Sequence, residues 1–129
     1  MHKLTEAQIS QIKGLDICDL VTFIDACSEA SGGLLGIINQ PRSRDGVGHT
    51  IDSLLANPIH AAQCAAIEVL RSRRPCDRSD LEMRNNCLAI WEIRCDNAAE
   101  AVKLLADIHN PEVVSQFKAA AGKQLASAA

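Results

Sequence analysis

The stretch from Asn57 to Arg74 decides the fold class, and it reads NPIHAAQCAAIEVLRSRR. Asn57 is a preferred N-cap residue and Pro58 suits the first position of a helix, so a helix is expected to begin here. Three arginines and then Pro75 are expected to end it. At about 100° per residue, its alanines and aliphatic residues cover a wide arc of the circumference. We therefore predict the central helix of an all-α domain.

The composition favours the same fold class. Of the 129 residues, 47% are hydrophobic and only 2% are aromatic, and the apolar positions are mainly Ala, Leu and Ile, which suit helices better than sheets. We predict one all-helical domain over residues 1–129, a compact bundle of six or seven helices. The connections are short except for one long loop at 31–49, and residues 122–129 are expected to fray.

Two helices are predicted before that loop. Thr5 and Gln8 have the spacing of a capping box, which indicates a short helix over residues 6–13. Asp16 is expected to cap a second helix that ends near Ala30, where glycines begin. Thr50 is expected to cap a further short helix, residues 51–56.

Three helices are predicted after the central one. Ser79 and Glu82 form a second possible capping box for a helix over 80–95, and Asp96 is expected to cap the next, which reaches 109. Asn110 and Pro111 start a last helix. The amphipathic pattern places one set of side chains inward: Leu81, Met83, Cys87, Leu88, Ile90, Trp91, Ile93, Ala98, Ala101, Val102, Leu105 and Ile108. It places another set outward: Glu82, Asn85, Glu92, Asp96, Glu100, Lys103 and Asp107.

The loop at 31–49 contains five of the seven glycines, and loops of this length in small domains are often functional. Arg42 and Arg44 precede a Gly-Val-Gly segment, His49 and a predicted helix start, which together have the parts of an anion cradle. The glycine spacing matches neither a Walker loop nor a dinucleotide fingerprint. The alternative is a surface connection without a ligand.

The cysteines and histidines offer one possible pair of metal ligands and one possible reactive thiol. His60 and Cys64 are four residues apart, so both can face one ion, but zinc requires three or four ligands and no paired-cysteine motif is present. We therefore predict no metal site. Cys76 is the one cysteine expected outside a helix, and the neighbouring arginines make it the candidate reactive thiol.

The net charge and the cysteine content restrict the classes of partner and the cellular compartment that we expect. A net charge of −3 makes nucleic-acid binding unlikely, although Arg71, Arg73, Arg74 and Arg78 form a local basic cluster. No apolar run reaches the length that a membrane span requires, so no membrane partner is expected. Six cysteines without a secretory pattern favour reduced thiols and a cytoplasmic setting.

No complete catalytic constellation emerges, so we predict no catalytic residues and no cofactor. The favoured hypothesis is a small interaction or regulatory module that binds itself, as a homodimer, or binds another protein. The second hypothesis is a small-ligand or anion-binding protein, conceivably an enzyme. Its site would combine the loop at 42–49 with His60 and the arginine cluster, and its candidate residues are Arg42, Arg44, His49, His60, Arg71, Arg74 and Arg78.

Overall fold

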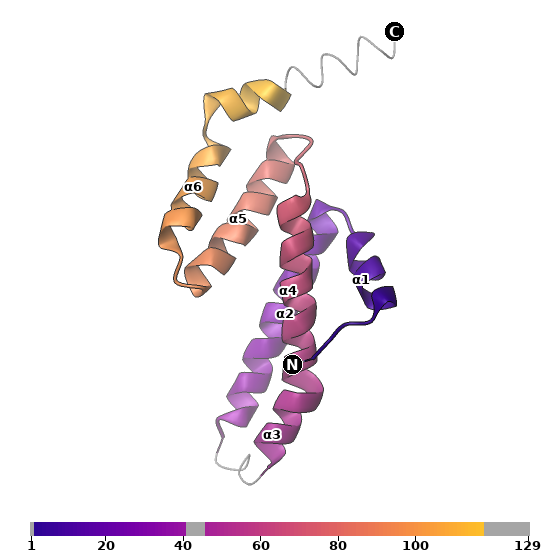
Figure 1. Cartoon of the computed structure of the whole chain (residues 1–129). Coiled ribbons are helices and arrows are strands. Elements are labelled where there is room, and N and C mark those ends of the chain that lie inside the picture. The colour runs from indigo at the N-terminus through magenta and orange to yellow at the C-terminus, as the bar shows by residue number, and fades with distance from the viewer. Residues whose placement is uncertain (1, 41–45, 118–129) are drawn as a thin grey trace. The chain divides into compact units, whose positions relative to one another are not determined.

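A computed structural model describes residues 2–40 and 46–117 of the chain (Figure 1). These residues contain helices and no strand, which confirms the all-α prediction. The elements are α1 (Glu6–Lys13), α2 (Ile17–Ile38), α3 (Val47–Ile51), the π-helix η2 (Asp52–Ala56), α4 (Asn57–Ser72), α5 (Arg78–Arg94) and α6 (Ala98–Ile108). Residues 111–117 are also helical.

The chain divides into two compact units, Met1–Ser72 and Arg73–Ala129. The first unit holds α1 to α4, and the second holds α5, α6 and the helical residues 111–117. The organisation of residues 1–129 as one domain stays a prediction.

The predicted starts of the first two helices are confirmed. The Gln8 backbone N–H donates to Thr5 Oγ1 at 3.2 Å, and the Thr5 N–H donates to Gln8 Oε1 at 2.9 Å. Asp16 Oδ1 accepts from the Asp19 N–H at 2.8 Å. Each of these side-chain oxygens satisfies a backbone amide at the helix start that has no partner within the helix.

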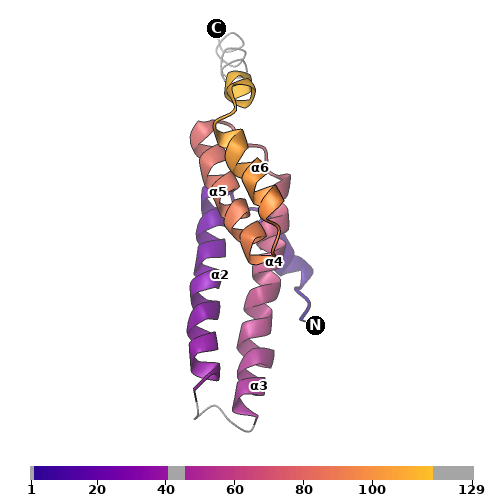
Figure 2. The ribbon, with the colours of Figure 1, turned by 90° about the vertical axis from the view of Figure 1, so that its left-hand side faces the viewer.

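The first unit is built around an antiparallel pair, α2 and α4, which lie side by side in both ribbon views (Figures 1 and 2). α2 buries Ile17, Leu20, Ile24 and Cys27, and α4 buries Gln63, Ala66, Ile67 and Leu70. The intervals of three and four residues place each set on one helical face. α1 packs against α4 and adds Ile12 to the core.

The predicted extent of the long loop, residues 31–49, is wrong. α2 continues through the glycines to Ile38, and α3 begins at Val47. A glycine in a helix costs about 1 kcal/mol relative to alanine, and half-buried Leu34 and Ile38 extend the apolar stripe of α2 beyond the glycines. That packing outweighs the local helix-breaking tendency.

Helix α4 begins at Asn57, close to the predicted start, but Asn57 is not an N-cap, because α4 continues the helical run of α3 and η2 without a break. Asn57 has helical angles, φ −63° and ψ −44°, and its N–H donates to the Asp52 carbonyl in a π-type bond. Proline lacks an N–H, and its ring collides with the carbonyl four residues earlier. The π-helix lets the helical run continue past Pro58, and Thr50 therefore lies inside α3 instead of capping a new helix.

The second unit is an α5–α6 hairpin whose caps differ from the predicted ones. Asp77, not Ser79, caps α5, because Asp77 Oδ1 accepts from the Asp80 N–H at 2.8 Å. Asp96 does not cap α6 with its side chain. Its φ of 58° places it in the left-handed region at the end of α5, and Asn97 precedes α6 without a side-chain cap.

The buried face of α5 also differs from the predicted one. Asn85 and Glu92, expected outside, have 1% and 5% of their surface exposed, whereas Ile90 and Ile93, expected inside, are 55% and 57% exposed. Asn85 Nδ2 donates to the Leu104 carbonyl at 2.8 Å, so its burial leaves that amide bonded. In α6, Val102 and Leu105 were likewise expected inside and are exposed.

The last predicted helix start is confirmed, since Asn110 Oδ1 accepts from the Glu112 N–H at 3.0 Å and residues 111–117 are helical. The predicted fraying at 122–129 lies outside the described residues. Phe117 is the last residue described.

Candidate functional site

The most unusual surface of the first unit is the tip of the hairpin that α2 forms with the run α3–η2–α4. We call residues 28–40 and 46–62 the hairpin tip. None of them is buried, although the tip is rich in aliphatic residues. Five of its large apolar side chains are exposed: Leu35 (57%), Ile37 (40%), Val47 (53%), Leu54 (68%) and Leu55 (50%).

Three of these side chains belong to one surface of the tip. Val47, Leu54 and Leu55 are spaced i, i+7 and i+8, so they lie on the same side of the α3–η2 run. On α2, a methyl group added at Gly32, Gly33 or Gly36 would meet no atom within 4 Å outside the local backbone. The tip therefore offers an apolar surface that no described residue covers.

The tip also has few charges. Between Glu29 and Asp52, the described residues include no lysine, arginine, aspartate or glutamate, and His49 is the only titratable one. In sequence, the segment between the two helices contains Arg42, Arg44 and Asp45. Within the tip, the described residues 30–40 and 46–51 are thus free of acidic side chains, lysine and arginine, and Glu29 and Asp52 flank them.

Because α2 is 22 residues long, it meets the length and composition of a membrane-crossing helix, with a mean hydropathy of 1.3 over its best window. The sequence predicted no apolar run as long as a membrane span, and α2 contradicts that prediction. Core helices of water-soluble proteins and signal sequences have the same properties, so one such helix is weak evidence.

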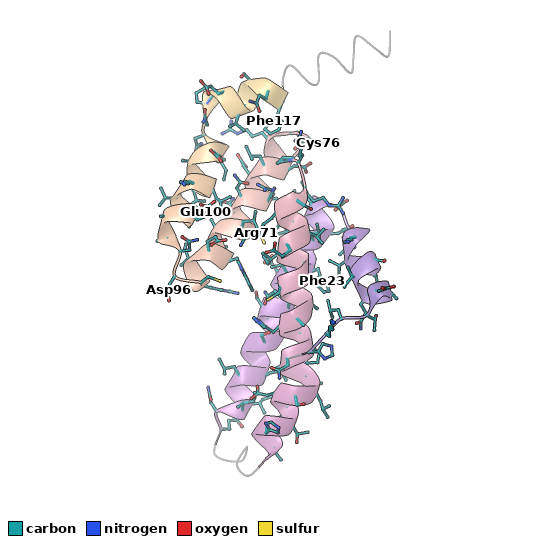
Figure 3. The ribbon with its side chains drawn as sticks, viewed as in Figure 1. Phe23, Arg71, Cys76, Asp96, Glu100 and Phe117 are labelled. Atoms are coloured by element: carbon teal, nitrogen blue, oxygen red, sulfur yellow. The ribbon has the colours of Figure 1, made fainter. Side chains whose placement is uncertain are left out.

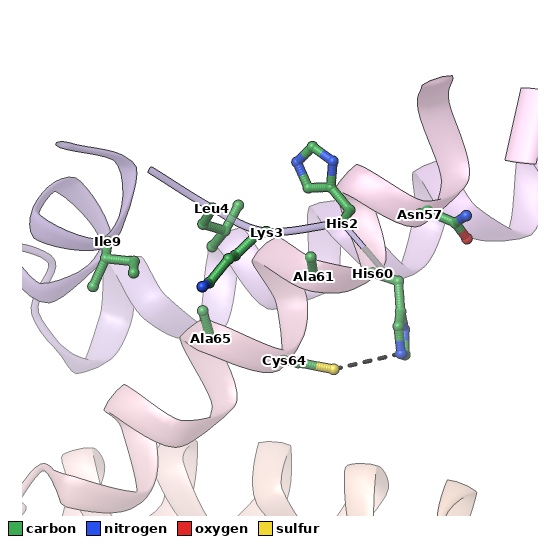
Figure 4. A pocket seen from close by; sticks show the side chains of 9 residues that line it. All are labelled: His2, Lys3, Leu4, Ile9, Asn57, His60, Ala61, Cys64 and Ala65. Atoms are coloured by element: carbon green, nitrogen blue, oxygen red, sulfur yellow. Dashed lines mark hydrogen bonds between the residues drawn. The ribbon is translucent and has the colours of Figure 1, made fainter. Parts of the chain in front are cut away.

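A cavity of about 760 Å³ lies in the first unit, where the segment before α1 crosses α4 (Figure 4). Such a volume is in the range of small-molecule sites. The lining residues are His2, Lys3, Leu4, Ile9, Asn57, His60, Ala61, Cys64 and Ala65. Most of its wall is aliphatic, and its polar groups are two imidazoles, an ammonium, a side-chain amide and a thiol.

The thiol and one imidazole in this cavity interact. Cys64 Sγ lies 3.5 Å from His60 Nε2, within hydrogen-bond reach for sulfur. The two residues are one helical turn apart on α4, so the helix itself sets their spacing. Figure 4 shows the thiol directed at the imidazole ring at one edge of the lining residues, with Leu4 and Ile9 toward the other edge. A thiol beside a base is the elementary unit of thiol nucleophilicity.

The predicted anion-binding residues of the first unit do not converge. His49, His60 and Arg71 belong to one continuous helical run and are eleven residues apart in each step. A rise of about 1.5 Å per residue separates each pair by about 16 Å. Arg71 Nε instead lies 3.4 Å from Glu68 Oε1. Among these three residues, His60 alone lines the cavity.

The other predicted site residues lie elsewhere. Arg42 and Arg44 are outside the described residues, and Arg74, Cys76 and Arg78 belong to the second unit. Arg78 Nε lies 3.2 Å from Glu82 Oε1. Cys76, labelled with Arg71 in Figure 3, is exposed and its backbone N–H donates to Asp80 Oδ2 at 3.3 Å. Its role as a reactive thiol stays a prediction.

Sequence reasoning found the His60–Cys64 pair from its spacing but missed the cavity and the hairpin tip. Lys3, Leu4 and Ile9 reach the cavity only because the N-terminal segment folds back onto α4, and no local pattern encodes that path. Within residues 2–40 and 46–117, no three His, Cys, Asp or Glu side chains are grouped as metal ligands. No family model, curated protein or solved structure matches this chain.

Proposed function

We propose that the protein is a small interaction module that self-associates through the hairpin tip. In the proposed dimer, two tips pack around a two-fold axis into a four-helix arrangement. One observation carries the proposal: five large aliphatic side chains of the tip are 40% to 68% exposed, in a stretch where no described residue is buried. Exposed apolar surface of this extent is typical of association sites.

The strength of such a dimer follows from the area it would cover. Burying the exposed half of a Leu, Ile or Val side chain contributes about 1 kcal/mol. Ten such side chains, five from each copy, therefore contribute about 10 kcal/mol before the loss of translational and rotational freedom is subtracted. Association costs at least about 4 kcal/mol, which leaves at most about 6 kcal/mol, so we expect a concentration-dependent dimer with a dissociation constant of about 40 μM or weaker.

A second copy suits the tip better than a lipid bilayer does. The described arms carry no fixed charge between Glu29 and Asp52, so two copies can approach without like-charge repulsion. Insertion of the tip into a bilayer would carry Arg42, Arg44 and Asp45 into or across the hydrocarbon region. Each charge there costs about 3 kcal/mol or more.

Sedimentation velocity over a concentration range tests the proposal with two matched variants. Leu54→Glu changes the most exposed aliphatic residue of the tip (68%), and Val102→Glu changes an equally exposed one of the second unit (65%). We expect the unaltered protein and Val102→Glu to dimerise alike. Leu54→Glu should weaken the dimer at least about tenfold, because two buried carboxylates would face each other across the axis.

Three outcomes would contradict the proposal. The protein could sediment as a monomer even at about 1 mM, well above a dissociation constant of about 40 μM. Val102→Glu could dissociate the dimer while Leu54→Glu leaves it intact, which would place the interface on the second unit. Finally, a monomer that co-sediments with phosphatidylcholine vesicles in a Leu54-dependent way would assign the tip to a membrane.

The cavity supports a second candidate function, small-ligand binding. It includes His60 from the predicted ligand set, while an anion site that also uses Arg42, Arg44, His49, Arg71, Arg74 and Arg78 stays a prediction. Thermal unfolding with inorganic phosphate tests the anion form. A rise in Tm that Arg42→Ala abolishes would support it, and no shift at millimolar phosphate would contradict it.

A cytoplasmic setting is also part of the proposal. All six cysteines are free thiols, and Cys27 and Cys87 are buried. Reducing compartments keep thiols in this state. Mass measurement of protein alkylated in cells tests it: six modified thiols after denaturation are expected, and fewer would indicate oxidation.

A further inference from the structure

Cys64 and His60 form a pair of a thiol and a base, and neither proposed function requires the reactivity of this thiol. The sulfur and the ring nitrogen are 3.5 Å apart, and both residues line a cavity whose other walls include Leu4, Ile9, Ala61 and Ala65. A base within hydrogen-bond reach increases the thiolate character of a cysteine. The adjoining aliphatic wall offers a place for an apolar group attached to whatever reacts with the sulfur.

We propose that Cys64 is a covalent modification site for α,β-unsaturated carbonyl compounds that carry an apolar chain. His60 acts as the base, and the aliphatic wall of the cavity holds the chain. The cavity shares Asn57, His60 and Ala61 with the hairpin tip, but none of the five exposed aliphatic residues that carry the proposed dimer lines it, so this assignment does not rest on self-association.

The reaction is a conjugate addition and it balances without a further reactant. His60 Nε2 takes the proton of the Cys64 thiol. The sulfur then forms a bond to the β-carbon of the unsaturated carbonyl, and the carbon–carbon double bond supplies the electron pair that moves onto the enolate. The imidazolium returns the proton to the α-carbon, so every atom of both reactants remains in the thioether product.

The other cysteines provide internal comparisons for the rate at Cys64. Cys27 and Cys87 are buried, and burial raises the pKa of the Cys27 thiol, which lowers its thiolate fraction. Cys18, Cys76 and Cys95 are exposed and are not among the residues that line the cavity. If access alone set the rate, these three would react faster than the half-buried Cys64.

The test uses N-alkylmaleimides, which are unsaturated carbonyl compounds, with chains from ethyl to octyl. The full chain is labelled briefly at neutral pH with a chelator present, and each cysteine is quantified by peptide mass spectrometry. We expect Cys64 to react fastest, at least about tenfold ahead of Cys18 and Cys95. We also expect its rate, and no other, to increase as the alkyl chain lengthens.

Two substitutions separate the base from the cavity. His60→Gln should remove the rate advantage of Cys64, whereas His49→Gln, another exposed histidine of the same helical run, should not. Ile9→Ser should remove the dependence on chain length while leaving the ethylmaleimide rate intact. Labelling of the buried thiols Cys27 and Cys87 that stays as slow as in the parent shows that each variant retains the fold.

Several results would overturn the assignment. Cys64 could label no faster than the exposed cysteines with any maleimide. His49→Gln could lower the rate as much as His60→Gln does, which would remove the role of the dyad. A rate at Cys64 that is independent of chain length would remove the role of the cavity. None of these results alters the sedimentation of the protein, so this inference and the proposed dimer fail separately.

Discussion

Gln63 Nε2 donates to the Ile24 carbonyl oxygen at 3.1 Å and to Ser28 Oγ at 2.7 Å, which joins α4 to α2 through a buried amide. Gln63 has 4% of its surface exposed and lies among apolar residues of the α2–α4 pair. An amide that is satisfied at this depth fixes the register of two helices that are otherwise joined by interchangeable aliphatic contacts. These two bonds lie at the boundary of the hairpin tip, because Ser28 is its first residue on α2 and Gln63 follows its last residue on α4.

We predict that Gln63→Leu lowers the free energy of unfolding by about 1–2 kcal/mol. Leucine keeps most of the volume but cannot donate, so the Ile24 carbonyl and Ser28 Oγ each lose the hydrogen bond from Gln63. Urea denaturation followed by circular dichroism measures the change. Ser28→Ala should cost less, and the double variant should be less destabilised than the sum, because both residues contribute to one network. A Gln63→Leu protein as stable as the parent would contradict the argument.

Asp96→Gly is predicted to stabilise the second unit. Asp96 has φ 58°, and the Asn97 N–H donates to the Glu92 carbonyl at 2.8 Å, the bond pattern of a Schellman motif. Glycine adopts this left-handed conformation without strain, so the free energy of unfolding should rise by about 1 kcal/mol. Asp96→Val should instead lower it by more than about 1 kcal/mol. If Asp96→Gly and Asp96→Val unfolded at the same urea concentration, the left-handed conformation of residue 96 would have no role in stability.

Pro58→Ala is predicted to strengthen the run from α3 to α4. Alanine restores the N–H that proline lacks and removes the clash with the carbonyl of Leu54, so α-type bonds can replace the π-helix at Asp52–Ala56. Amide hydrogen exchange of residues 52–58 should slow at least about threefold. Exchange in α5 serves as the control and should not change. Faster exchange at 52–58 would show that the π-helix is stabilised by packing instead of imposed by proline.

We predict that the Cys27 thiol makes the folded protein less stable at alkaline pH than at neutral pH. Burial raises the pKa of its thiol above the ordinary value of 9.0, so the unfolded chain releases this proton at lower pH than the folded chain does. The stabilising contribution of the protonated Cys27 thiol is complete below its pKa in the unfolded chain. It is lost as pH rises through its pKa in the folded protein. Urea denaturation at neutral pH and at about pH 10 should show a smaller loss in Cys27→Ala than in the parent. Cys18→Ala, which changes an exposed thiol of the same helix, should lose as much as the parent.

The sequence predicted some elements well because their determinants are local. The Thr5–Gln8 box and the Asp16 cap each depend on residues three positions apart, and both bonds form as expected. The ends of α2 and α5 were predicted less well. Glycines after Ala30 are compatible with a loop or with a continued helix. The Ser-x-x-Glu pattern at Ser79 is compatible with a helix cap or with the first turn of a helix. Long-range packing selects between these local structures.

The candidate site was predictable only in part, for the same reason. The spacing of His60 and Cys64 on a helix predicts that the two side chains meet, and they do, at 3.5 Å. The aliphatic wall opposite them comes from Leu4 and Ile9. Those residues are more than fifty positions away in sequence, and a single sequence does not encode that proximity in any local pattern.

The sequence by itself determined the helical class, because Ala, Leu and Ile recur at helical intervals and the chain is nearly without aromatic residues. Only the tertiary structure decided which faces are covered. In α5, apolar residues surround the helix, so periodicity alone does not define an inner face. Asn85 and Glu92 could be buried because the Leu104 carbonyl and the Asn97 amide bond to them, at 2.8 and 3.0 Å. Ile90 and Ile93 were left exposed as a consequence.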